Sequence, residues 1–199
     1  MERCRLVLSG SGGQGVITAA IILAEAAVLY EGLSAVQSQS YGPEARGGAT
    51  RSDVIIADGE IYYPKVIQPN VLVCLTQQAY DKFHPIVRPG GLLITDCHFV
   101  TNRTRVEAVQ KHFPLYQTMM EKIGKPVVFN ICMLGTIIGL TGLVKPESIE
   151  KTLEQRIAPA FLQMNLQALS LGLQMAQSKP APIKFPSQPW KKKKADGQG

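Results

Sequence analysis

The sequence lacks the cysteine spacing that metal centres in proteins need. Its four cysteines, Cys4, Cys74, Cys97 and Cys132, stand far apart, and no C-x-x-C pair occurs. We therefore predict neither a zinc knuckle nor a ferredoxin-type iron–sulfur cluster in this chain. Cys74 and Cys97 lie within apolar runs, which predicts buried thiols rather than a disulfide. Reduced thiols of this kind fit a cytoplasmic location.

Side chains for catalysis are also scarce. The three histidines, His84, His98 and His112, do not fall at ligand spacing, and each lies near a proline or a loop, as surface or packing histidines do. No G-x-S-x-G nucleophile motif occurs. Asp96 ends a predicted strand, where it can belong to a site or cap the following loop. We predict no catalytic residue and no metal ligand here, as expected for one part of a larger enzyme.

Long uninterrupted apolar runs are missing as well. Residues 127–144 are apolar enough to be considered as a membrane span, but they are interrupted by Asn130, Gly135, Gly139 and Gly142. No charge pattern that favours insertion flanks them, so a buried helix is the prediction. The N-terminus begins directly with a strand pattern, which is not the pattern of a signal peptide.

Positive charge is concentrated at the end of the chain. The net charge is +6 over 199 residues, but residues 179–199 alone hold six lysines and one acid. The remainder is close to neutral, which argues against a nucleic-acid-binding face. We expect one α/β domain over residues 1–178 and a proline- and lysine-rich tail over residues 179–199. In this tail, Phe185 and Trp190 are either anchors on a partner chain or part of a solvated end.

A glycine-rich loop is the feature around which the chain is organised. It lies between an apolar run at residues 6–8 and a helical pattern at residues 16–30, and it consists of Gly10, Ser11, Gly12, Gly13, Gln14 and Gly15. A strand, a G-x-G-x-x-G loop and a helix in this order indicate a site where backbone N–H groups and a helix N-terminus bind phosphate. The alternative is a tight turn whose glycines only permit close packing.

Two common uses of such a loop do not match the sequence. Gln14, Gly15 and Val16 stand where a P-loop has its lysine and its serine or threonine, so ATP hydrolysis of that type is not expected. A dinucleotide dehydrogenase carries an acidic residue at the end of its second strand. Gln39 and Ser40 occupy that place, which weakens NAD binding as an interpretation and leaves it open.

A second irregular loop covers residues 40–48. A proline and three glycines exclude regular structure there, and its candidate site residues are Tyr41, Gly42, Arg46 and Gly47. Because this loop follows the second predicted strand, we expect it beside the first loop at the carboxyl edge of the sheet. Arg46 can bind a phosphate through two N–H groups. The alternative is an ion pair with Glu44 or Asp53 that only shapes the loop.

The whole pattern predicts an α/β fold, a three-layer Rossmann-like architecture with a mixed, mainly parallel sheet and helices on both faces. Strands are expected at residues 4–9, 34–39, 49–57, 71–75 and 92–95, and Asp58-Gly59 predicts a hairpin whose second strand is residues 60–63. Helices are expected at residues 16–30, 77–83, 103–111, 130–142, 146–156 and 160–176.

The two loops together resemble the gamma subunit of 2-oxoacid:ferredoxin oxidoreductases. The resemblance rests on residues 10–16, on residues 41–48 (Tyr-Gly-Pro-Glu-Ala-Arg-Gly-Gly) and on the helix start Asn130-Ile131-Cys132-Met133-Leu134-Gly135. It extends over residues 5–176 and leaves out the lysine tail. The second loop is most similar to that of the 2-oxoglutarate enzymes, whereas pyruvate, branched-chain and indolepyruvate relatives carry different second loops.

The resemblance implies a CoA-binding subunit of a complex that converts 2-oxoglutarate to succinyl-CoA or runs in reverse. It implies thiamine diphosphate, magnesium and iron–sulfur clusters on alpha, beta and ferredoxin-like delta partners, with ferredoxin as electron acceptor and with neither nucleic acid nor membrane span. We expect coenzyme A to contact Gly10, Ser11, Gly12, Gly13, Gln14, Gly15, Tyr41, Gly42, Arg46 and Gly47.

Three alternatives remain open. The chain can be a subunit of a related pyruvate, branched-chain or indolepyruvate oxidoreductase. It can be a stand-alone nucleotide-binding, Rossmann-like protein. It can also be an assembly subunit whose loops contact protein only.

Overall fold

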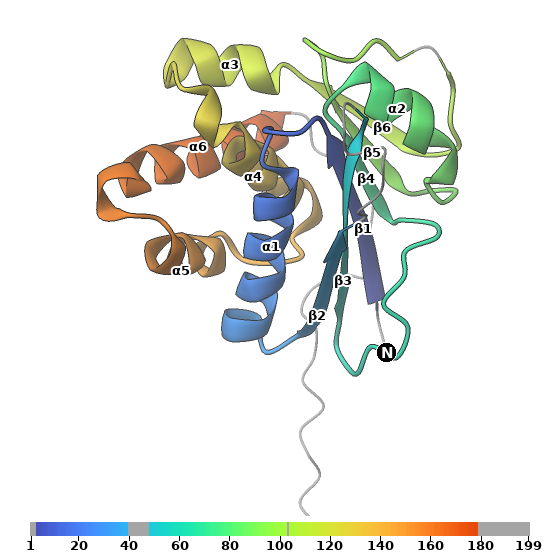
Figure 1. Ribbon diagram of the computed structural model, residues 1–199, viewed down its shortest axis with the longest axis horizontal. Coiled ribbons are helices and arrows are strands. Elements are labelled where there is room, and N and C mark those ends of the chain that lie inside the picture. Colours follow the sequence, from blue (N-terminus) through green and yellow to red (C-terminus); the bar gives the residue numbers. More distant parts are fainter. Residues whose placement is uncertain (1–2, 40–47, 103, 179–199) are drawn as a thin grey trace, which may run out of the picture.

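The computed structural model of the chain describes residues 3–39, 48–102 and 104–178, and in these residues six strands form one sheet (Figure 1). The strands are β1 (Arg3–Gly10), β2 (Ser34–Gln39), β3 (Thr50–Ala57), β4 (Val71–Cys74), β5 (Leu92–Asp96) and β6 (Val109–Phe113). The helices are α1 (Val16–Glu31), α2 (Gln77–Phe83), α3 (Leu115–Lys122), α4 (Phe129–Thr141), α5 (Pro146–Arg156) and α6 (Pro159–Ser178), with short 3-10 helices η2 (His84–Ile86) and η3 (Pro126–Val128).

The sheet is mixed and mainly parallel, as predicted. Its strand order is β2-β3-β1-β4-β5-β6. The β1–β4, β4–β5 and β5–β6 pairs are parallel, whereas β3 is antiparallel to both β1 and β2. β3 therefore runs against the other strands, and the start of β3 lies at the same edge as the end of β1, where Thr50 pairs with Gly10.

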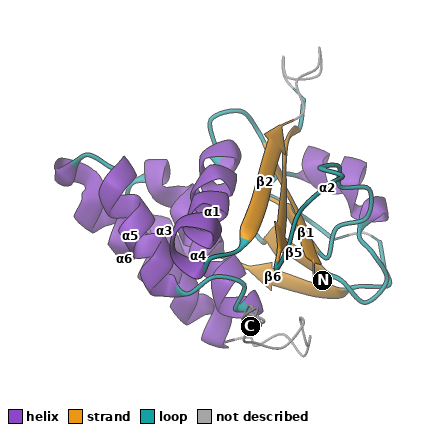
Figure 2. Ribbon diagram, turned by 90° about the horizontal axis from the view of Figure 1, so that it is seen from below, coloured by secondary structure: helices purple, strands orange, loops and turns teal. Residues whose placement is uncertain are grey.

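Helices cover both faces of the sheet unequally. Figure 2 shows α1, α3, α4, α5 and α6 on one face and α2 on the other. The side chains of β1 alternate between two cores, since Leu6 and Leu8 pack in the larger cluster with α1 and α4, and Val7 packs in the smaller cluster with α2. Helices on both faces of one sheet confirm the prediction of a three-layer architecture.

The long apolar stretch near the C-terminus forms the buried centre of the thicker layer. All but two residues of α4 are buried, and the helix ends at Gly142, whose φ is 62°. A helix that is apolar on all sides needs neighbours on all sides, and α4 has α1, α3, α5 and α6 around it. Within the described part of the chain, no helix combines the length and the apolarity that crossing a bilayer requires.

The hairpin prediction for Asp58-Gly59 is wrong. Residues 60–63 form no strand, and Tyr62 and Tyr63 are 84% and 56% exposed. The physical reason is that β3 has no free edge, because β1 and β2 already occupy both of its sides. β3 forms its hairpin with the preceding β2 instead.

Two further predictions along the chain are wrong. The helix predicted at residues 103–111 is absent from the described residues 104–111, because residues 109–113 form β6, whose hydrogen-bonded pairing with β5 outweighs a weak helical period. Cys97 is exposed, since the apolar run ends at Asp96 and Cys97 begins the turn that follows β5. Cys74 is buried as predicted, and burial raises the pKa of its thiol.

Candidate functional site

The glycine loop lies at the point where the chain connections change sides of the sheet. From the end of β1 the chain enters α1 on one face, and from the end of the adjacent, parallel β4 it enters α2 on the other face (Figures 1 and 2). In open α/β sheets, ligands bind in the crevice outside the carboxyl ends of strands at such a switch point. The topology therefore gives the loop the position of a binding site.

The middle of the loop is open to solvent. Apart from its chain neighbours, a Cβ atom added at Gly12 or Gly13 would meet no atom of the described residues within 4 Å, and both glycines are exposed in this part of the chain. Gly13 also has a φ of 87°, a conformation that favours glycine. Gly12 and Gly13 are therefore not required for packing against the described residues, and an anionic group can approach their main chain.

The ends of the loop are packed. An added Cβ at Gly10 would overlap the Gln14 amide oxygen and lie 3.3 Å from the Cβ of Leu75. At Gly15, whose φ is 70°, it would lie 2.7 Å from the Nδ2 atom of Asn130. The packing interpretation of the loop therefore holds for Gly10 and Gly15, whereas the phosphate-binding interpretation of Gly12 and Gly13 stays a prediction.

The backbone donors near the loop fit a phosphate. Gly15 caps the start of α1 and offers no side-chain hydrogen bond, and the first turn of the helix contains no acidic residue. The Ser11 amide donates to Gln14 Oε1 at 2.8 Å, which holds the turn in shape. The first-turn N–H groups of α1 and the positive end of its dipole therefore face the loop, a position that favours an anion.

Asn130 is a residue whose structural role the sequence did not indicate. Its Nδ2 atom donates to the Gly15 carbonyl oxygen at 3.4 Å, which links the start of α4 to the start of α1. The residue is only 7% exposed, and its Oδ1 atom is buried with no hydrogen-bond partner among the residues that the structure describes. Such a long-range contact between residues 15 and 130 has no local sequence signal.

The second loop is framed by residues that the structure describes. Tyr41, Gly42, Arg46 and Gly47 lie outside the described residues. Both flanks of their segment reach the edge that holds the glycine loop, because Gln39 ends β2 opposite Ser52 and Thr50 pairs with Gly10. The Ser9 hydroxyl donates to the Thr50 carbonyl oxygen at 2.8 Å. The chain therefore enters and leaves residues 40–47 beside the first loop.

One alternative partner of Arg46 is already engaged. Asp53 forms a bidentate ion pair with Arg51, with 2.6 Å from Nε to Oδ1 and 2.9 Å from Nη2 to Oδ2. Arg51 also donates to the Val66 carbonyl oxygen at 2.7 Å. An ion pair between Arg46 and Asp53 would thus have to share a carboxylate that Arg51 holds.

Asp96 has the capping role. Its Oδ1 atom accepts a hydrogen bond from the His98 amide at 2.8 Å, and its Oδ2 atom accepts one from the Tyr116 amide at 2.7 Å. Burial raises the pKa of this carboxyl group, while these amides oppose the rise. The carboxylate fixes the turn after β5 and the start of α3. In the described residues, no three His, Cys, Asp or Glu side chains come together as a metal site would need.

Comparison with known proteins gives a consistent result. The chain matches the family described as pyruvate ferredoxin/flavodoxin oxidoreductase over residues 5–175. It is 44% identical to the 2-oxoglutarate synthase subunit KorC of Methanocaldococcus jannaschii, over 88% of this chain and 95% of that one. It is 39% identical to the subunit of the same name from Methanothermobacter marburgensis, over 87% and 96%.

A solved structure is similar over almost its whole length. The keto/oxoacid ferredoxin oxidoreductase gamma subunit from Geobacter sulfurreducens PCA is 41% identical, with a TM-score of 0.81, covering 88% of this chain and 99% of that one. The fold, the switch-point loop and these likenesses agree with each other. The chain therefore belongs to the pyruvate ferredoxin/flavodoxin oxidoreductase family, as a gamma-type subunit of a 2-oxoacid:ferredoxin oxidoreductase.

Proposed function

We propose that this chain is the CoA-binding gamma subunit of a 2-oxoglutarate:ferredoxin oxidoreductase, which catalyses the CoA-dependent oxidative decarboxylation of 2-oxoglutarate to succinyl-CoA or its reverse. The observation that carries the proposal is the open backbone at Gly12 and Gly13 in front of an uncapped helix N-terminus. Coenzyme A carries a pyrophosphate and a 3′-phosphate, and such a backbone suits these groups.

The residues of this chain hold and orient the nucleotide end of coenzyme A in this proposal. The N–H groups at Gly12, Gly13 and the first turn of α1 donate to phosphate oxygens, and the Ser11 hydroxyl lies within the same loop. Arg46 supplies a guanidinium from the second loop, together with the backbone of Gly42 and Gly47 and the side chain of Tyr41. Gly10, Gln14 and Gly15 keep the loop in shape.

The redox chemistry belongs to the partners. Thiamine diphosphate with magnesium supplies decarboxylation, and iron–sulfur clusters carry the electrons to ferredoxin. We assign these groups to alpha, beta and ferredoxin-like delta subunits. We also place the complex in the cytoplasm, where the free thiols of Cys4, Cys74, Cys97 and Cys132 stay reduced.

The choice of 2-oxoglutarate rests on the relatives and on the second loop. Both archaeal relatives named above are called 2-oxoglutarate synthase subunits. We expect the complex purified with this chain to reduce ferredoxin at least tenfold faster, as kcat/KM, with 2-oxoglutarate than with pyruvate or a branched-chain 2-oxoacid. A higher kcat/KM with pyruvate would assign the chain to a related enzyme and leave the CoA site intact.

A charge placed at Gly12 tests the phosphate site. Gly12→Asp adds a carboxylate at an open position, and Gly12→Asn adds a neutral group of the same size. In the assembled complex we expect the apparent KM for CoA to rise about tenfold more in Gly12→Asp than in Gly12→Asn. The reason is that the added carboxylate repels the CoA phosphates at a position that otherwise favours an anion. The KM for the 2-oxoacid should be the same in both.

Arg46 offers a second comparison at the same site. We expect Arg46→Ala to raise the apparent KM for CoA severalfold, because one charged hydrogen-bond donor to phosphate is lost. Equal KM values for CoA in Gly12→Asp and Gly12→Asn would contradict the phosphate site itself. An unchanged KM in Arg46→Ala alone would remove only the role of Arg46.

A further inference from the structure

Helix α6 has an exposed face without a single charged side chain. None of its 20 residues is Asp, Glu, Lys, Arg or His. The helix packs against α4, and Figure 2 shows it in the helical layer on the side away from the sheet. Five exposed residues follow one another at helical spacing along its outer surface, and we call them the glutamine stripe: Gln163, Gln167, Ser170, Gln174 and Gln177.

Half-buried apolar side chains border the glutamine stripe. At about 3.6 residues per turn they fall on its two sides, with Met164, Leu171 and Met175 on one side and Leu162, Leu166 and Leu173 on the other. Near the start of the helix Phe161 is 57% exposed, and η3, which α6 contacts, has Val127 72% exposed. Methionine, aromatic and uncharged residues together are the composition of the core of a protein–protein interface.

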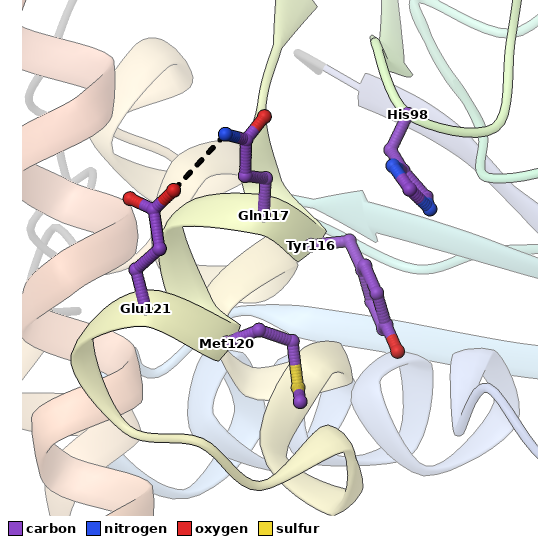
Figure 3. Close-up of a pocket in the computed structure, with 5 residues that line it drawn as sticks. All are labelled: His98, Tyr116, Gln117, Met120 and Glu121. Carbon is purple, nitrogen blue, oxygen red and sulfur yellow. Dashed lines mark hydrogen bonds between the residues drawn. The ribbon is translucent and has the colours of Figure 1, made fainter.

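Two other helices of the same layer have the charged surface that faces solvent in most proteins. In α5, five of the 11 residues are charged, and all five are exposed. On α3, the exposed Gln117 donates through Nε2 to Glu121 Oε1 at 3.0 Å, and Figure 3 shows these two side chains pointing toward each other. On α6, Gln174 Nε2 instead lies 3.4 Å from the hydroxyl of Ser170. The lack of charge therefore distinguishes α6 from α3 and α5.

Such a face is inexpensive to bury against another protein. A charged side chain that loses its water without a partner costs several kcal/mol. A glutamine amide can exchange its hydrogen bonds to water for bonds to the backbone or amides of a partner, because it has both donors and an acceptor. The glutamine stripe and its apolar borders therefore fit a protein surface that has no charged side chains at its centre.

The sequence places positive charge directly beside this face. Residues 179–199, which follow the last residue of α6, hold six lysines and one acid. A partner that covers α6 and carries acidic side chains next to its uncharged centre would complement both parts. A second copy of this chain would bring another lysine-rich segment in place of acidic side chains. The charges therefore favour a different subunit as the occupant.

We propose that the glutamine stripe of α6 and its apolar borders form the surface through which this chain binds another subunit of the oxidoreductase. The partner surface has an uncharged centre that covers α6 and acidic side chains that lie toward residues 179–199. The glycine loop takes no part in this contact, so the inference does not depend on where coenzyme A binds.

The test uses glutamine-to-glutamate changes, which add a charge and hardly change the shape of the side chain. Gln167→Glu and Gln174→Glu place the charge in the glutamine stripe, and Gln155→Glu places it on the exposed surface of α5 as the matched control. The complex is assembled from the full-length chain and the other subunits. Sedimentation velocity over a dilution series then gives the apparent Kd for this chain, and circular dichroism gives its thermal unfolding midpoint.

We expect both stripe variants to raise the apparent Kd at least tenfold, because the new carboxylate must be buried beside an acidic surface. Gln155→Glu should change the Kd less than twofold, and all three unfolding midpoints should equal that of the wild type, since the three positions are exposed. The same Kd in the stripe variants and the control would overturn the proposal.

Two other results would assign the face to a different occupant and overturn the proposal as well. If the isolated chain is a dimer that Gln167→Glu dissociates, a second copy covers α6. If the isolated chain cut after Ser178 shows faster amide exchange at residues 159–178 than the full-length chain, residues 179–199 cover it.

Discussion

At Gly12 an added Cβ would meet no described residue within 4 Å beyond its chain neighbours, whereas at Gly172 it would overlap the Cys132 carbonyl oxygen and lie 2.8 Å from the Thr136 amide nitrogen. The first glycine belongs to the loop that opens toward solvent. The second belongs to the contact between α4 and α6, which we call the α4–α6 seam and define by Gly135, Gly139 and Gly172. The same residue type leaves space for a ligand in one region and for a neighbouring helix in the other.

The α4–α6 seam brings two helix backbones into direct contact. An added Cβ at Gly135 would overlap the Leu169 carbonyl oxygen, and one at Gly139 would lie 2.7 Å from the Cβ of Ala176. Thr136 uses this proximity, because its hydroxyl lies 3.1 Å from the Cys132 carbonyl oxygen and 3.2 Å from that of Gly172. The seam therefore stabilises the helical layer against which α1 and its loop rest.

The largest expected effect is on stability at the seam. Gly172→Ala should lower the free energy of unfolding by about 3 kcal/mol, because the methyl group cannot fit between two backbones and the better helix propensity of alanine offsets only about 1 kcal/mol. Gly12→Ala, the matched control, should change it by less than about 0.5 kcal/mol. Urea unfolding of the full chain measures both. Similar losses at the two positions would remove the distinction between open and closed glycines.

The next effect concerns Gly15, which lies in the loop and yet is packed. Gly15→Ala should lower the free energy of unfolding by about 2 kcal/mol, because the backbone at this position is left-handed and the added methyl group overlaps Asn130. In the double variant with Asn130→Gly the overlap disappears, because the Nδ2, Cγ and Cβ atoms that lie 2.7, 2.8 and 2.9 Å from the added Cβ are all removed. The combined loss should therefore be about 1 kcal/mol smaller than the sum of the single losses. A double-mutant cycle by urea unfolding measures this coupling. Strict additivity would show that Asn130 does not restrict Gly15.

The smallest effect is at the far end of α1, where contacts are exposed. Arg156 on α5 pairs with Glu25 on α1, with Nη2 2.7 Å from Oε1, and the two side chains are 39% and 36% exposed. Arg156→Gln should therefore cost only about 0.5 kcal/mol at neutral pH. Loss of this ion pair should lower the free energy of unfolding far less than loss of the packing at Gly15.

The pH dependence of this pair has a definite sign. The hydrogen bond from Arg156 lowers the pKa of Glu25 from its usual 4.5 in the folded chain. The contribution to stability is therefore complete above pH 4.5 and is lost as the pH falls through the lowered pKa. Stability curves of the wild type and Arg156→Gln should converge in acid. A difference that grows on acidification would contradict the assignment.

Much of the fold could be predicted because its signals are local. The run at residues 4–9 and the helical spacing from Val16 correspond to β1 and α1. The strand that β5 forms and the start of α5 at Pro146 also follow from short patterns. Buried strands and capped helices are specified by neighbouring residues, so one sequence is enough to find them.

The errors occurred where distant segments decide the structure. Residues 60–63 had a turn signal, but the edge they needed was taken by β2. Residues 103–111 were assigned to a helix, but pairing with β5 makes residues 109–113 a strand. The glycine loop was found from its glycines, whereas the contact of Asn130 with Gly15 depends on packing between α4 and α1. Patterns within one segment do not report such contacts.

Amide hydrogen exchange of the assembled complex tests the central claim most directly, because it locates bound coenzyme A on the chain. We predict that saturating CoA slows exchange of peptides that cover residues 10–18, while pantetheine, which has the thiol and no phosphate, leaves them unchanged. Peptides from the α4–α6 seam should exchange slowly with or without CoA. If CoA supports turnover and yet the exchange of residues 10–18 stays the same, the glycine loop does not bind its phosphates.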